Sequence, residues 1–129
     1  MADDRAQFQA HLFGTFLKEA AMHRAAVPGL LGKLEQAPEA DDVAQELLRE
    51  IHSLKGAAGA VGQEQIEFLC RSLEQVIIKA RRGEHAIDAA FFEAFRQGLS
   101  LLDGGLAAIA DGGRFTISLQ FLESVRKLT

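Results

Sequence analysis

The sequence predicts an all-α protein, an antiparallel up-down four-helix bundle with a short fifth helix at the C-terminus. The composition favours helices, because Ala and Leu are abundant, Trp and Tyr are absent and only two Pro occur. Hydrophobic residues recur at spacings of three and four along five stretches. Short segments containing Gly, Pro or Asp separate these stretches, and helices joined by short loops pack most simply as antiparallel neighbours.

The first helix is predicted over about residues 5–36. We expect Pro28 to kink or briefly interrupt it, because proline lacks an N–H and clashes with the preceding turn. His11 and His23 lie on this helix with no acidic partner nearby in the sequence, and we expect both on the surface. The apolar side comprises Phe8, Leu12, Phe13, Phe16, Leu17, Ala20, Val27, Leu30, Leu31 and Leu34.

The second helix is predicted over 42–61, with Asp41 or Asp42 as its N-cap and Gly62 as its end. The third helix is predicted over 63–82. Cys70 falls inside the apolar stripe of that helix, so we expect a buried and unreactive thiol.

The fourth helix is predicted over 88–110, with Asp88 as its N-cap. A turn follows, and a fifth helix is predicted over 117–128. Together the five segments predict one domain over residues 1–129.

Composition also restricts the functional classes. The net charge of -4 gives no electrostatic basis for binding nucleic acid or an anionic membrane. A single cysteine excludes an internal disulfide and fits a reducing compartment. No apolar run approaches the roughly 20 residues that span a bilayer, and the N-terminus does not look like a signal peptide. We therefore expect a cytoplasmic protein.

Residues 47–62 contain the candidate site. His52 follows the core residue Ile51, so it is rotated by roughly 100° from the buried stripe and lies at its edge. Three residues share its face at spacings of three, four and seven: Lys55, Gly56 and Gly59. Each helical Gly costs about 1 kcal/mol relative to Ala, so two of them on one face indicate that a helix or a partner comes close to the backbone there.

Glu74 is the candidate partner of His52. In a hairpin that turns near Gly62, His52 lies ten residues before the turn and Glu74 lies twelve residues after it. The two side chains are therefore expected at similar depth on neighbouring helices.

The segment His52-Ser53-Leu54-Lys55-Gly56, closed by Gly62, resembles the phosphoacceptor signature of histidine phosphotransfer (HPt) domains. The longer pattern from Arg49 to Gly62 is most similar to the CheA subfamily, the N-terminal phosphotransfer domains of chemotaxis kinases. Leu73-Glu74 and Arg81-Arg82-Gly83 extend this resemblance, which covers most of the chain. The resemblance implies the same bundle architecture.

The resemblance also implies a function. A CheA-type kinase domain would phosphorylate His52 on Nε2, and the phosphoryl group would pass to an aspartate of a CheY-like or CheB-like receiver domain. Glu74 would accept the Nδ1 hydrogen of His52, Lys55 would act on the phosphate or the partner, and Gly56 would leave room. The domain itself would bind no cofactor and no metal, since the partners would supply ATP and Mg²⁺ and the chain has no G-x-x-x-x-G-K-[ST] loop.

The expected docking surface comprises Arg49, Ser53, Lys55, Gly56, Gly59 and Arg71. Arg71 departs from the subfamily, which often has His at that position. Pairing of Arg71 with Glu74, pairing with Glu67 and direct contact with phosphate are all open from the sequence.

Other interpretations remain. The resemblance favours a segment of a longer chemotaxis kinase, acting as a monomer when isolated, over a stand-alone HPt protein of another phosphorelay. A helical adaptor that is never phosphorylated would not need His52, Lys55 and Gly56 together. A metal-binding or haem-binding bundle would need Glu-x-x-His pairs or axial ligands that point inward from several helices. No Glu-x-x-His occurs, the four His are scattered along the sequence, and His52 lies off its core stripe.

Overall fold

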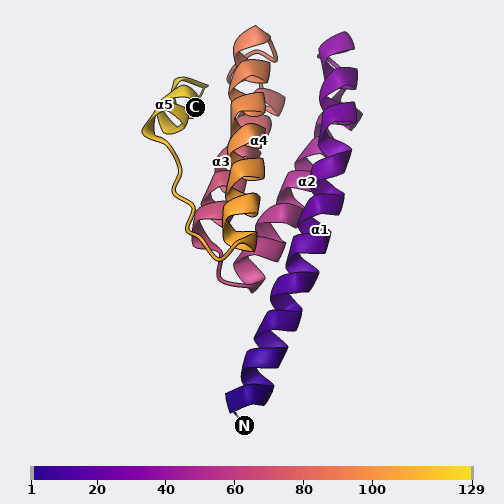
Figure 1. Cartoon of the computed structure of the whole chain (residues 1–129). Coiled ribbons are helices and arrows are strands. Elements are labelled where there is room, and N and C mark those ends of the chain that lie inside the picture. The colour runs from indigo at the N-terminus through magenta and orange to yellow at the C-terminus, as the bar shows by residue number, and fades with distance from the viewer. Residues whose placement is uncertain (1, 129) are drawn as a thin grey trace.

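In the computed structural model, residues 2–128 form five α-helices and no strand (Figure 1). The prediction of an all-α fold is therefore confirmed over this range. The helices are α1 (Ala2–Gln36), α2 (Asp41–Ala60), α3 (Glu64–Arg81), α4 (Ala89–Ala110) and α5 (Leu119–Leu128).

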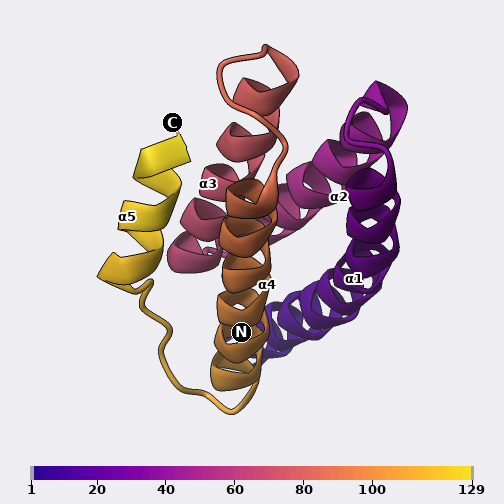
Figure 2. The same cartoon turned by 90° about the horizontal axis from the view of Figure 1, so that it is seen from above.

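Helices α1 to α4 run alternately up and down, and each contacts the next (Figure 1). Contacts between α1 and α4 close the bundle, and α5 packs against α3 and α4 (Figure 2). This arrangement confirms the predicted bundle with a fifth helix. The α2–α3 pair carries the candidate site, because His52 lies on α2 and Glu74 lies on α3.

Pro28 does not interrupt α1, which continues to Gln36. Of the two outcomes expected at Pro28, a kink or an interruption, the interruption is absent, and Figure 2 shows α1 as a single curved helix. Val27, Leu30 and Leu31 are buried on both sides of the proline. We attribute the continuity to this packing, which offsets the roughly 3 kcal/mol that an interior proline costs.

Side chains cap the starts of α4 and α5. The Asp88 carboxylate accepts a hydrogen bond from the Phe91 backbone N–H at 3.2 Å, as predicted. The Ser118 hydroxyl oxygen accepts one from the Phe121 N–H at 3.2 Å, so α5 begins two residues later than expected. Both caps satisfy a backbone donor that has no partner within its helix.

The start of α2 differs from the prediction. Ala40 is the N-cap residue, and no side chain caps this end of the helix. Asp41 is instead the first helical residue, and its carboxylate accepts hydrogen bonds of 2.8 and 3.0 Å from Arg81 at the end of α3. At the other end of the pair, Gly62 has a φ of 73°, a conformation that glycine adopts readily, and it turns the chain into α3.

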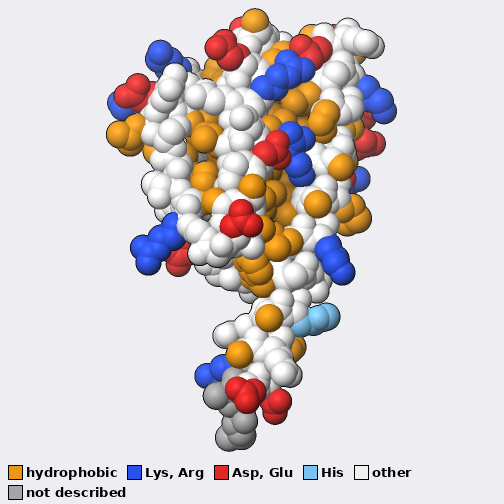
Figure 3. All heavy atoms as spheres, in the orientation of Figure 1, with side chains coloured by type: hydrophobic (Ala, Val, Ile, Leu, Met, Phe, Trp, Pro, Cys, Tyr) orange, Lys and Arg blue, Asp and Glu red, His pale blue; other side chains and the backbone are white. Residues whose placement is uncertain are grey.

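The N-terminal turns of α1 project beyond the body of the bundle (Figure 3). Phe8 is 63% exposed and Leu12 is 40% exposed in this segment. Within residues 2–128, no helix combines the length and the apolar character needed to cross a membrane.

Candidate phosphotransfer site

Three side chains from α2 and α3 form a connected polar cluster. His52 Nδ1 lies 2.7 Å from Glu74 Oε2, and Lys55 Nζ donates to Glu74 Oε1 at 2.7 Å. One carboxylate therefore binds an imidazole and an ammonium group from the same face of α2. The spacing of three residues between His52 and Lys55 lets both reach it.

Core packing on both helices sets this arrangement. Ile51 and Leu54 of α2 are buried, which turns His52 to the edge of the interface. Leu73 and Val76 of α3 are also buried, and Glu74 between them faces α2. The hairpin turn at Gly62 then places His52 and Glu74 at the same level along the two antiparallel helices.

Glu74 is the buried member of the cluster, with 8% of its side chain exposed. Burial by itself would raise the pKa of this carboxyl, because it disfavours the charged form. Hydrogen bonds from Lys55 and His52, and then the charge of Lys55, outweigh that effect and hold the pKa below its usual value. Glu74 is therefore an anion at neutral pH, even though it is buried.

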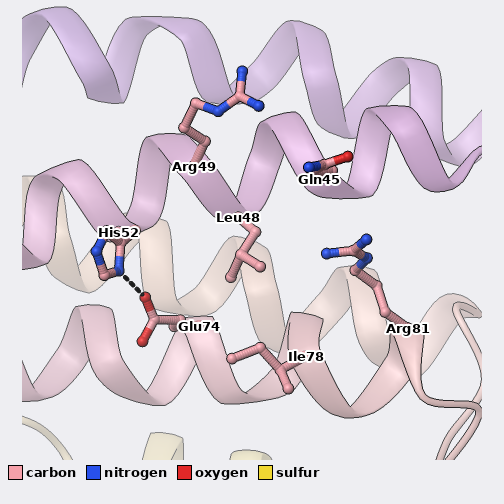
Figure 4. A pocket seen from close by; sticks show the side chains of 7 residues that line it. All are labelled: Gln45, Leu48, Arg49, His52, Glu74, Ile78 and Arg81. Carbon is pink, nitrogen blue, oxygen red and sulfur yellow. Dashed lines mark hydrogen bonds and ion pairs between the residues drawn. The ribbon is translucent and has the colours of Figure 1, made fainter.

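The ionised carboxylate defines the tautomer of His52. An ionised carboxylate can only accept hydrogen bonds, so Nδ1 must carry the hydrogen. The Nε2 lone pair is then free, and Figure 4 shows this nitrogen on the side of the ring away from Glu74. The His52 side chain is 68% exposed, so a partner can reach that nitrogen. The geometry provides an oriented and accessible nucleophile.

A groove of about 420 Å³ begins at His52 and follows the α2–α3 interface towards the start of α2 (Figure 4). Leu48 and Ile78 project into it from the two helices. Its lining comprises Gln45, Leu48, Arg49, His52, Glu74, Ile78 and Arg81. The sequence did not reveal this groove, because it depends on how the two helices pack.

The predicted docking residues of α2 lie on both sides of His52 along the helix. Arg49 lines the groove, and Arg49, Gly56 and Gly59 are exposed. A Cβ on Gly56 would meet open space, whereas one on Gly59 would collide with the Glu67 carboxylate. Gly59 therefore accommodates a neighbouring side chain, and the roles of these residues in docking stay predictions.

Arg71 pairs with Glu67 at 3.7 Å, one turn earlier on α3. Glu74 is instead occupied by His52 and Lys55. Ser53 is partly buried beside His52. Of the pairings left open for Arg71, the structure shows the one with Glu67 and not the one with Glu74, and contact with phosphate stays a prediction.

A second histidine–carboxylate pair was missed. His23 Nδ1 lies 2.7 Å from Glu50 Oε2, and the His23 side chain is 23% exposed, so it is partly buried in a pair that was not predicted. Glu50 comes from α2, 27 residues later, and helix packing rather than local sequence brings it close. His11 is exposed, as expected.

Cys70 is fully buried in the core of α3, as predicted. Burial raises the pKa of its thiol to about 12, and the nearby charge of Glu74 adds to that effect. A thiol with such a pKa holds almost no thiolate at neutral pH and is unreactive. Within residues 2–128, no group of three or more His, Cys, Asp or Glu side chains could hold a metal ion.

Comparison with known proteins identifies the family. The Hpt domain family matches residues 11–109, so the chain belongs to the Hpt domain family. This span includes the whole α2–α3 pair and its polar cluster.

The individual proteins that the chain resembles are distant relatives. The chain is 28% identical over 86 residues to the "Chemotaxis protein CheA" of Listeria monocytogenes, which covers 63% of this chain and 14% of the relative. It is 26% identical to the protein of the same name from Bacillus subtilis, over 76% of this chain and 15% of the relative. It is 28% identical to the "Sensor histidine kinase CheAY" of Helicobacter pylori, over 78% of this chain and 13% of that protein. No solved structure matches significantly.

Proposed function

We propose that the chain is the phosphoacceptor and phosphodonor module of a chemotaxis-type phosphorelay, with His52 as the histidine that carries the phosphoryl group. One observation supports this assignment above the others. The Nδ1 of His52 is held by a buried carboxylate while the ring stays 68% exposed. Distant similarity to proteins named CheA supports the chemotaxis context.

In the first step, Nε2 of His52 attacks the γ-phosphorus of ATP bound to a CheA-type kinase domain. An N–P bond forms, the bond from the γ-phosphorus to the bridging oxygen breaks, and ADP leaves. The ring keeps its Nδ1 hydrogen and gains positive charge, which the Glu74 carboxylate at 2.7 Å stabilises. The kinase supplies ATP and Mg²⁺, and this domain supplies a positioned nucleophile.

In the second step, an aspartate carboxylate of a CheY-like or CheB-like receiver attacks the phosphorus. The O–P bond forms, the N–P bond breaks, and neutral His52 is restored with its hydrogen still on Nδ1 and donated to Glu74. Lys55 serves both steps by keeping Glu74 ionised. We place these reactions in the cytoplasm and assign the domain no bound cofactor of its own.

The test is a two-stage labelling assay. Wild-type protein is incubated with labelled ATP and an active CheA catalytic fragment, and then with a CheY-like receiver. We expect acid-labile, base-stable label on the domain that moves to the receiver. His52→Gln should remain unlabelled.

The matched control is His23→Gln, because His23 also bonds a carboxylate at 2.7 Å. We expect this variant to label as wild type does. Label on the His52→Gln protein would show that another histidine is the acceptor. A small phosphoramidate donor, which needs no docking, provides a second route to phosphohistidine. Failure of wild type to label by either route would favour a helical adaptor.

A further inference from the structure

We propose that Arg71 binds the phosphoryl group once that group is attached to His52. This inference rests on the proposed function and adds one residue to it. Arg71 leaves its present partner, Glu67, and pairs with the phosphate oxygens. The phosphoryl group then lies between an imidazole of α2 and a guanidinium of α3.

Two contacts fix how α2 and α3 are aligned beside the histidine. Glu74 bonds His52, and Glu67 lies against Gly59. Seven residues separate the two members on each helix, from 52 to 59 on α2 and from 67 to 74 on α3. The helices are antiparallel, so the residues between these contacts face one another across the interface.

Arg71 and Gly56 lie between those contacts, on α3 and α2 respectively. Arg71 is exposed there, whereas its neighbour Cys70 is buried in the core. A Cβ on Gly56 would meet open space. Gly56 therefore leaves room for a guanidinium beside the face of α2 that carries His52.

The reacting nitrogen of His52 faces the same direction. Figure 4 shows Nε2 on the side of the ring away from Gln45 and Arg81. Those two residues lie towards the start of α2 and the end of α3, so Nε2 is turned towards the opposite end of the pair. Arg71 precedes Glu74 by three residues in that direction, about 4.5 Å along α3. An arginine side chain spans such a distance.

The present ion pair of Arg71 is easily exchanged. Its guanidinium lies 3.7 Å from the Glu67 carboxylate, and the two side chains are 53% and 34% exposed. A long and exposed pair within one helix contributes little to stability. A phosphoryl group offers Arg71 two negative charges and oxygens that can accept paired hydrogen bonds.

The site also needs a second cation after phosphorylation. Glu74 is already an anion, and the phosphoryl group adds about two negative charges beside it. Lys55 is bonded to Glu74 at 2.7 Å. Arg71 supplies a further positive charge on the side towards which Nε2 points. This charge lowers the free energy of the phosphorylated domain, which is the intermediate between the two transfer steps.

The first test measures the ionisation of the phosphoryl group in Arg71→Gln, Arg71→Lys and a control, Arg82→Gln. Arg82 is also exposed, and it lies eight residues after Glu74 in the opposite direction. Each protein is phosphorylated with phosphoramidate, and ³¹P NMR follows the signal that is absent from His52→Gln. We expect Arg71→Gln to raise the pKa of the phosphoryl group, because a nearby cation favours the dianion. Arg71→Lys should restore most of the difference, and Arg82→Gln should match wild type.

The second test measures the phosphorylation equilibrium with a CheA catalytic fragment at a fixed ratio of ATP to ADP. Arg71→Gln should lower the ratio of phosphorylated to free domain about threefold, as expected for loss of an exposed ion pair. Glu67→Gln should raise that ratio, because it releases Arg71. This gain should disappear in a protein that also carries Arg71→Gln.

The outcomes separate this inference from the proposed function. An unchanged phosphoryl pKa in Arg71→Gln would overturn the inference, and so would equal shifts in Arg71→Gln and Arg82→Gln. A gain from Glu67→Gln that persists without Arg71 would overturn the exchange of partners. Absence of phosphohistidine on wild type with both donors would instead refute the proposed function itself.

Discussion

Residues 2–128 contain two histidine–carboxylate pairs with the same 2.7 Å separation and different patterns of burial. In the His52–Glu74 pair, the imidazole is 68% exposed and the carboxylate is 8% exposed. In the His23–Glu50 pair, the two side chains are 23% and 28% exposed, so neither is strongly buried or freely accessible.

The number of partners differs too. Glu74 also binds Lys55, whereas no described side chain other than His23 bonds Glu50. Under the proposed function, the histidine–carboxylate distance would not distinguish the phosphoacceptor, because both pairs have the same distance. A buried carboxylate with two hydrogen-bond partners fixes one nitrogen of the ring. Exposure of the ring leaves the other nitrogen free to react.

The largest expected difference between the pairs comes from neutralising each carboxylate. Glu74→Gln removes the negative charge that stabilises the imidazolium and leaves Lys55 facing a neutral amide. Phosphorylation of His52 should therefore slow about 10–100-fold. Glu50→Gln should leave the rate unchanged. Initial rates of labelling by a CheA catalytic fragment measure both. Equal losses in the two variants would show that the two pairs do not differ in function.

Loss of the second partner should have the next largest effect. Lys55→Met leaves a buried carboxylate held by His52 alone, so the free energy of unfolding should fall by about 2 kcal/mol near neutral pH. Lys18→Met, at an exposed position of α1, should change it little. Denaturant unfolding measures both, and equal effects would show that Lys55 is an ordinary surface lysine.

The ion pair between Lys55 and Glu74 also predicts that the stability of the fold depends on pH. The pKa of Glu74 is lowered in the folded state, so its ionisation stabilises the fold above its unfolded pKa of about 4.3. That contribution is lost as the pH falls through the lower folded value. Lys55→Met should raise the pKa of Glu74 and move the loss to higher pH, which NMR titration of the Glu74 carboxyl carbon can follow. An unchanged titration would contradict the role given to Lys55.

The smallest effect concerns access to the exposed ring. Gly56→Ala places a methyl group in open space on the face of His52, so stability should rise by about 1 kcal/mol. Docking of a partner across that face should weaken, which would slow transfer to a receiver while labelling by phosphoramidate stays unchanged. The stability gain should be smaller for Gly59→Ala, because Glu67 must move aside. Faster transfer by Gly56→Ala would argue against a role for access.

The sequence alone determined the secondary structure and the edge position of His52. Apolar spacing located all five helices within a few residues, because burial of one face requires the helical period. The same period rotates His52 away from Ile51, and the turn at Gly62 limits which residues of α3 can face it.

Tertiary packing decided what surrounds that histidine. The sequence left open whether Glu74 was solvated, whereas the packed α2–α3 pair buries it and gives it both His52 and Lys55. Contacts between segments far apart in the chain also kept α1 continuous through Pro28 and paired His23 with Glu50. These outcomes depend on distances between helices, which local periodicity does not specify, because the period fixes a side chain's direction and not what it meets.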